Sequence, residues 1–172
     1  MLGLKHNVNF LVDYDPSWAE EFAEEHDRIA AVLGDIPKGI EHFGSTSVPG
    51  MRAKPILDII IGLDPISDWR SCLDPLVSIG YDYVENAGVP GSYVFGRGRD
   101  LSERTHLVHL VEWMGPSWVS NLALRDALRR DPELRRAYIA EKEKAAAGAP
   151  DNRKHYIELK RGFIDRAKAS LV

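Results

Sequence analysis

The feature that most constrains this chain is an aspartate inside an apolar run. Residues 56–61 read Ile-Leu-Asp-Ile-Ile-Ile, so Asp58 is the one polar side chain of the run. β-Branched residues favour a strand, in which Asp58 points to the same face as Ile56 and Ile60. A carboxylate in apolar surroundings is costly unless it is paired, hydrogen-bonded or bound to a metal. The pattern indicates either a functional carboxylate or a buried aspartate that accepts hydrogen bonds from a loop.

A glycine-bearing loop precedes this strand. It opens with Gly44, Ser45 and Thr46 and continues through Ser-Val-Pro-Gly towards Lys54. Glycine lets the backbone approach a ligand closely and leaves amide groups free to face an anion. Lys54 lies between the loop and the strand, where it could meet a phosphate or pair with Asp58. The sequence therefore combines a phosphate-binding loop with a carboxylate, a pairing that nucleotide chemistry uses.

Composition narrows the classes of partner. The 172 residues carry a net charge of −4, with an isoelectric point near 5.9. This balance argues against nucleic acid as a partner, since nucleic-acid binding usually requires a basic surface, but it allows a local cationic pocket. The single Cys72 excludes an intramolecular disulfide. Because no basic-then-apolar leader and no run of about 20 apolar residues is present, we expect no membrane partner and a cytoplasmic location.

The spacing of apolar and turn residues predicts one α+β domain over residues 1–172. Its sheet portion takes about residues 1–115 and its helical portion about residues 116–172. We expect helices at residues 13–33, 69–79, 117–130, 132–147 and 152–171, and strands at residues 40–43, 56–61, 81–84, 93–95 and 105–111. The candidate N-caps of the last three helices are Ser117, Asp131, and Asp151 or Asn152.

Two basic side chains fall on the apolar faces of predicted helices. Lys160 lies inside the apolar stripe of the last helix, four residues after Tyr156. A lysine there either extends to the rim of the core or reaches an anion. The same spacing argument turns Arg125 inward. Both residues are therefore candidates for binding an anionic ligand.

Two histidines on the predicted strand at residues 105–111 resemble a metal-binding pair at first sight. Residues three apart on a strand face opposite sides, so His106 and His109 cannot readily bind one ion from regular β-structure. Each could instead be a hydrogen-bonded core histidine. The sequence therefore predicts no histidine metal pair on this strand.

Two further basic segments could be either ligand-binding elements or ordinary solvent-exposed structure. The glycine-spaced turn with Arg97 and Arg99 could close over a polyphosphate, or it could be a solvent-exposed hairpin loop. The simplest interpretation of the charged stretch at residues 129–144 is a solvated helix face with charge pairs one turn apart.

The stretch from Gly44 to Asp58 resembles a family signature. A Gly-Ser turn, a loop of about a dozen residues and an aspartate in an apolar strand are similar to the nucleotidyltransferase superfamily that includes DNA polymerase β. The fuller resemblance is to its GrpB branch, the glutamate-rich protein B family. That branch reads close to Gly-Ser-Thr-(Ala/Ser)-Val-Pro-Gly-x-x-(Ala/Gly)-Lys-Pro-Ile-(Ile/Leu)-Asp. The resemblance continues at residues 106–112, 124–129 and 156–163, and so covers nearly the whole chain.

The resemblance implies a nucleotidyltransferase-like mixed sheet flanked by helices, with a helical C-terminal segment. It implies catalytic roles for Asp58 and His109, and Mg²⁺ bound by Asp58. Catalytic members of the superfamily carry a second carboxylate two residues after the first, so that both bind the metal on one strand face. Here that position is Ile60, and a distant residue such as Glu112 or His109 would have to supply the second ligand. Residues implied in phosphate or ligand binding are Gly44, Ser45, Thr46, Lys54, Arg125, Tyr156 and Lys160.

Two functional hypotheses follow from these residues. In the first, the chain is a nucleotidyltransferase-fold enzyme that binds a nucleotide or another phosphorylated small molecule and transfers a nucleotidyl group to a small acceptor. In the second, it is a non-catalytic ligand-binding or interaction module that kept the phosphate loop and lost the metal-binding carboxylate pair. Ile60 favours the second hypothesis, whereas Asp58, Lys54 and Lys160 favour a functional pocket under either.

Overall fold

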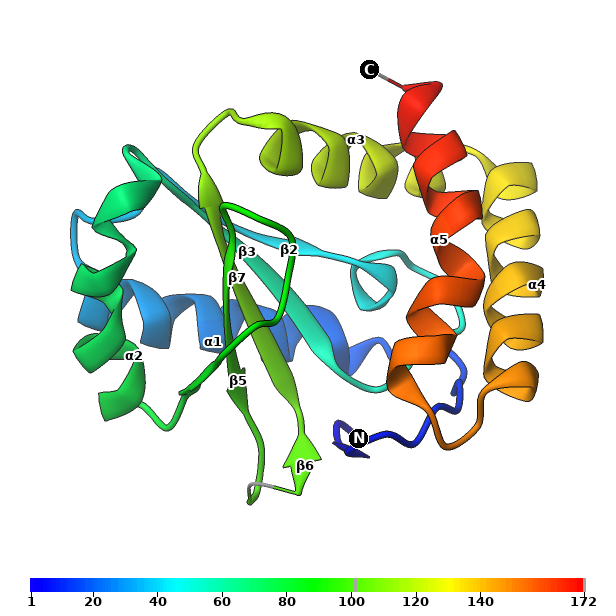
Figure 1. Ribbon diagram of the computed structural model, residues 1–172, viewed down its shortest axis with the longest axis horizontal. Coiled ribbons are helices and arrows are strands. Elements are labelled where there is room, and N and C mark those ends of the chain that lie inside the picture. Colours follow the sequence, from blue (N-terminus) through cyan, green and yellow to red (C-terminus); the bar gives the residue numbers. More distant parts are fainter. Residues whose placement is uncertain (101, 172) are drawn as a thin grey trace.

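The computed structural model describes residues 1–100 and 102–171, which adopt the α+β fold that the sequence predicts (Figure 1). A mixed sheet of five strands and a small sheet of two strands are combined with five α-helices in this described part. The strands are β1 (Leu4–Lys5), β2 (Gly39–Phe43), β3 (Leu57–Leu63), β4 (Asp82–Val84), β5 (Tyr93–Arg97), β6 (Glu103–Arg104) and β7 (His106–Glu112). The helices are α1 (Ser17–Leu33), α2 (Leu73–Ser78), α3 (Pro116–Arg130), α4 (Pro132–Gly148) and α5 (Arg153–Ala169), with 3₁₀ helices at Ser45–Ser47 and Ile66–Cys72.

The order of strands in the larger sheet is β2-β3-β7-β5-β4. β3 and β7 pair in parallel near its centre, and the other neighbours are antiparallel. Asp58 lies opposite Leu107 and Ile60 lies opposite His109. Since side chains on paired positions point to the same face, Asp58 and His109 belong to one face of the sheet.

The two faces of the sheet are covered differently. Ile59, Ile61 and Val108 point towards α1 and α2, where they form the main apolar core with Ile29 and Leu76. The opposite face lies towards α3, α4 and α5 (Figure 1). α4 and α5 pack against each other on this side of the sheet. Among the described residues no helix is long and apolar enough to cross a membrane.

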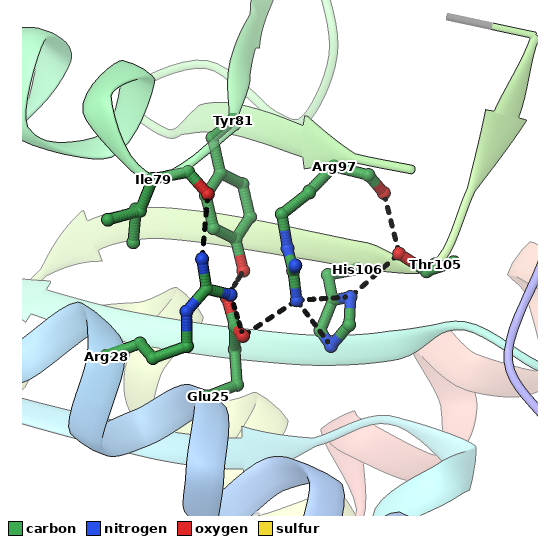
Figure 2. A network of polar contacts seen from close by, with 7 residues as sticks. All are labelled: Glu25, Arg28, Ile79, Tyr81, Arg97, Thr105 and His106. Atoms are coloured by element: carbon green, nitrogen blue, oxygen red, sulfur yellow. Dashed lines mark hydrogen bonds and ion pairs between the residues drawn. The ribbon is translucent and has the colours of Figure 1, made fainter. Parts of the chain in front are cut away.

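A buried polar network joins α1 to β5 and β7 on the face of the sheet that α1 covers (Figure 2). Glu25 of α1, only 3% exposed, accepts hydrogen bonds from Tyr81 Oη, Arg97 and Arg28, each at 2.7 Å. Burial, and then the nearby Arg97, lower the pKa of His106 to about 4, so its imidazole stays neutral beside that guanidinium. Arg97 therefore does not close over a phosphate in the cavity, because the carboxylate of Glu25 holds it on the other face of the sheet. Arg99 is largely exposed, as the hairpin-loop alternative expects.

The ends of helices agree with the predicted ones where a side chain caps the helix. Asp131 caps α4 by accepting hydrogen bonds from the backbone N–H groups of Glu133 and Leu134, and Asn152 caps α5 in the same way. The prediction of Ser117 as a cap was wrong, because Gly115 stands at that position with Pro116 in the first turn. The predicted helix at residues 69–79 is a 3₁₀ helix followed by the short α2. Pro75 accounts for this break, since it has no N–H to bond to the preceding turn.

Candidate functional site

A cavity of about 400 Å³ lies between the second face of the sheet and α5. The side chains around it are strongly unbalanced in charge. Five lysine and arginine residues contribute to its wall, and Asp58 is the one carboxylate among the lining residues. The lining consists of Leu4, His6, Asn7, Ser45, Thr46, Lys54, Ile56, Asp58, Val84, Ala87, Gly88, Val94, Arg104, Leu107, His109, Lys142, Arg153, Tyr156, Ile157 and Lys160. An acidic protein therefore concentrates positive charge in one internal space.

Asp58 and His109 form the centre of this wall. His109 Nε2 lies 3.6 Å from Asp58 Oδ1, and the side chains are 26% and 31% exposed. That separation suits an ion pair but is too long for a hydrogen bond, and Nε2 has no hydrogen-bond partner among the described residues. Burial opposes ionisation of the Asp58 carboxyl, but His109 and the ammonium groups of Lys54 and Lys160 outweigh it and lower its pKa. Asp58 is thus an ionised, solvent-reachable carboxylate.

Gly44 lets the loop approach this carboxylate. Its backbone has φ 71° and ψ −171°, a region that is essentially restricted to glycine. A Cβ atom added at this position would lie 2.7 Å from Asp58 Oδ2. The glycine predicted to cradle a phosphate therefore has a second effect, because it brings the chain over Asp58 itself.

Lys54 and Lys160 converge on one aromatic ring. Lys54 Nζ lies 4.4 Å from the centroid of Tyr156, and Lys160 Nζ lies 4.9 Å from the same centroid. Tyr156 is almost completely buried, so both ammonium groups sit at the edge of the core. Burial, and then the positive charge of Lys160, lower the pKa of Lys54 to about 6. Burial also lowers the pKa of Lys160 to about 8, against the attraction of Asp58.

Three lysine and arginine residues of the cavity wall were not predicted from the sequence. Lys142 is 1% exposed and donates a hydrogen bond to the carbonyl oxygen of Arg52, so the predicted solvated face at residues 129–144 was wrong at this position. Arg153 donates to Asn9 Oδ1, and Arg104 is paired with Asp82. One signal was available: Lys142 follows Tyr138 by four residues and lies over its ring, which repeats the spacing of Tyr156 and Lys160.

The predicted loop residues contribute unequally. Ser45 and Thr46 both line the main cavity, but Ser45 is half-buried, whereas Thr46 is buried with its hydroxyl 2.9 Å from His42 Nε2. Arg125 lies outside the main cavity, where its guanidinium hydrogen-bonds to Glu41 and to the carbonyl oxygen of His42. It lines a smaller cavity of about 230 Å³ on the other side of Asp58. Ser45, Asp58, His109 and Lys160 line both cavities.

The residues around Asp58 do not fit a magnesium site. Ile60, at the second carboxylate position, is completely buried against Val111 and Trp118. Glu112 accepts a hydrogen bond from the backbone N–H of Ile66 at the other end of β7, so it does not supply a second ligand. In the described part of the chain no group of three or more His, Cys, Asp and Glu side chains is arranged to hold a metal. One carboxylate and one imidazole beside two ammonium groups are a poor donor set for Mg²⁺, which prefers oxygen ligands.

Comparisons with known proteins agree with this architecture. The family model described as GrpB protein matches residues 9–170. The chain is 30% identical over 168 residues to the glutamate-rich protein GrpB of Alkalihalophilus pseudofirmus, an alignment that covers 96% of this chain and 97% of that protein. The crystal structure of the conserved protein GrpB from Enterococcus faecalis superposes with a TM-score of 0.83 at 30% identity, covering 94% of this chain and 96% of that chain.

A more distant likeness concerns the fold alone. The Cid1 poly(U) polymerase, in a crystal structure described as MgGTP bound, superposes with a TM-score of 0.54 at 13% identity. The superposition covers 79% of this chain and 44% of the polymerase chain. The predicted nucleotidyltransferase-like fold is therefore confirmed at the level of architecture.

Proposed function

This chain belongs to the GrpB family, and we propose that it binds a nucleotide or another phosphorylated small molecule in the cavity beside Asp58. The observation that carries this proposal is the charge of that cavity. Lys54, Lys142, Arg153 and Lys160 face Asp58 as the one lining carboxylate, in a protein whose net charge is −4. Cations gathered in a half-buried space repel one another, so an anion of high charge density is the ligand that would relieve the imbalance.

The distribution of polarity within the cavity supports a nucleotide in particular. Its α4 and α5 side carries most of the cations, whereas Val84, Val94 and Leu107 line the side formed by the sheet. A cavity of about 400 Å³ lies in the size range of small-molecule sites. A ligand with one flat apolar part and one phosphorylated part would match both sides. The nucleotidyltransferase-like fold adds an independent, architectural reason to test nucleotides first.

Nucleotidyl transfer to a small-molecule acceptor is a second candidate, favoured by the two cavities that meet at Asp58 and His109. A nucleoside triphosphate in the larger cavity would leave the smaller one for an acceptor, whose hydroxyl oxygen would bond to the α-phosphorus as the bond to the departing pyrophosphate breaks. Nε2 of His109 is buried and has no hydrogen-bond partner among the described residues, so it would serve as the base for the acceptor's hydroxyl proton only after the acceptor gains access to it. Incubation with each nucleoside triphosphate and a panel of small hydroxyl compounds, followed by mass spectrometry, would reveal the transferred group as a defined mass increase.

Calorimetric titration tests the binding proposal directly. We expect saturable binding of at least one common nucleotide to the wild-type protein. Lys160→Met should abolish this binding and leave the melting temperature nearly unchanged, because in the described part of the chain its ammonium contacts the ring of Tyr156 but no hydrogen-bond acceptor. Lys144→Met, on the exposed side of α4, is the matched control and should bind normally. Absence of binding to every nucleotide would sink the proposal, and a large loss of stability with binding intact would make Lys160 structural.

A further inference from the structure

The two lysines on Tyr156 have an unusual combination of properties. Other cavity lysines are satisfied internally: Lys142 donates to the carbonyl oxygen of Arg52, and Lys168 of the smaller cavity donates to Asn121 Oδ1. In the part of the chain that the structure describes, Lys54 and Lys160 contact the face of Tyr156 but no hydrogen-bond acceptor. Each of these two ammonium groups therefore has donor capacity left over, and both face the cavity.

Their backbones are held firmly. Ala53, next to Lys54, exchanges two backbone hydrogen bonds with Val12, and the carbonyl oxygen of Lys54 itself accepts from the N–H of Ile56. Lys160 lies well inside α5. The shared ring is 1% exposed. Both charges are consequently positioned before any ligand arrives, which reduces the ordering cost of binding.

The same place in the fold is where the family resemblance implies a metal ion. Asp58 has the position of a metal ligand, but Ile60 is buried where the second carboxylate would stand. Instead, positive charge already surrounds Asp58, since Lys54 and Lys160 both contribute to lowering its pKa. A divalent cation entering this space would meet at least two ammonium groups and a single carboxylate, so its binding is opposed by the local charge.

We propose that the ammonium groups of Lys54 and Lys160, seated on Tyr156, take the place of a divalent cation, so that a phosphorylated ligand binds this cavity without metal. The inference deepens the proposed function and rests on it. The lysine pair donates hydrogen bonds to phosphoryl oxygens. Because burial lowers the pKa of Lys54 to about 6, its amine takes up a proton as the polyanion binds. Asp58 attracts the two ammonium groups electrostatically rather than binding a metal. The ligand form recognised is then the free polyanion, because Mg²⁺ bound to the phosphates would mask the oxygens that the lysines contact.

Titration of the wild-type protein with ATP and with inorganic pyrophosphate, in excess EDTA and in excess Mg²⁺, tests the inference without any mutation. We expect at least one of the two probes to bind at least as tightly in EDTA as in Mg²⁺. If chelation weakens binding by about tenfold or more, the inference is wrong and the proposed function stands. If neither probe nor any other nucleotide binds under either condition, the proposed function itself fails.

Asp58→Asn separates the two roles of the carboxylate. Removing a negative charge from an anion site should leave the affinity for the probe in EDTA unchanged or increase it. A metal ligand would behave in the opposite way, since its loss would remove binding in Mg²⁺. Lys54→Met should weaken binding of the probe by about tenfold or more. The control variant Lys144→Met, which removes an exposed lysine, should bind the probe with unchanged affinity. Tight binding by Lys54→Met in EDTA would overturn the lysine-pair mechanism.

Discussion

At the scale of single residues, Gly44 carries a constraint that no other residue type meets. Its dihedral angles are restricted to glycine, and a Cβ there would collide with the Asp58 carboxylate. We expect Gly44→Ala to lower the free energy of unfolding by about 3 kcal/mol and to displace Asp58. Urea denaturation measures the first effect.

Gly50→Ala provides the matched control for that substitution. Gly50 also has a positive φ, but a Cβ at this position would meet no atom within 4 Å. It should therefore cost only about 1 kcal/mol, the backbone term alone. An equal loss in the two variants would show that the close approach to Asp58 contributes nothing.

The cavity lysines give the unliganded protein a pH dependence of defined sign. Burial lowers the pKa of Lys54 to about 6 and that of Lys142 to about 7, whereas lysines of the unfolded chain titrate near 10.4. Between about pH 6 and pH 10 the unfolded chain holds more protons, so stability should rise with pH across this window. Lys54→Met should make the rise shallower in urea denaturation at several pH values. An unchanged slope relative to wild type would show that Lys54 titrates normally.

A site residue could be predicted from the sequence only where its neighbours along the chain indicated that its side chain is buried. Asp58 and Lys160 stood out because each interrupts an apolar stripe, and both line the cavity. Lys142 did not stand out, because α4 is charged on most of its surface and its buried side is set by packing against α5 and the loop at Arg52. Arg153 was missed for a similar reason, since its partner Asn9 is remote in sequence.

At the scale of elements, the Glu25 network joins α1 to β5 and β7 (Figure 2). Glu25→Gln removes the charge that Arg97 and Arg28 share and keeps the shape of the side chain. We expect the free energy of unfolding to fall by about 3 kcal/mol, because the half-buried guanidinium group of Arg97 loses its counter-ion. Chemical denaturation checks this value. Glu24→Gln, one position earlier and exposed, should change stability by no more than about 0.5 kcal/mol, and equal effects would contradict the assignment.

Helices and strands could be predicted where residues close together in the sequence determine them. Long helices with caps, such as α4 after Asp131, and strands rich in β-branched residues, such as β3, begin and end near their expected residues. The two-residue strands β1 and β6 were not foreseen, because such short pairing is fixed only when the N-terminal segment meets the turn before β7. The role of Arg97 was unpredictable for the same reason, since its carboxylate partner lies in α1.

At the scale of the whole molecule, the overall charge and the charge of the cavity have opposite signs. The chain shares its fold with a poly(U) polymerase, yet its net charge is −4, and its lysine pair lies in a half-buried cavity rather than along an exposed groove. Polynucleotide binding depends on many phosphate contacts over an extended basic surface. Under the proposed function a small phosphorylated ligand binds inside the cavity, whereas a strand of many phosphates would have to bind along the outside of a chain whose net charge is −4.

We therefore expect no saturable binding of a fluorescein-labelled oligouridine at about 0.15 M salt, a concentration that leaves close charge contacts effective. Fluorescence anisotropy measures this directly, with displacement by free nucleotide as the companion measurement. Lys160→Met should leave any residual anisotropy signal unchanged, because such a signal would come from the exterior and not from the cavity. Saturable binding that weakens steeply with salt and disappears in Lys160→Met would show instead that the cavity accepts one end of a polynucleotide, and the small-molecule assignment would have to give way.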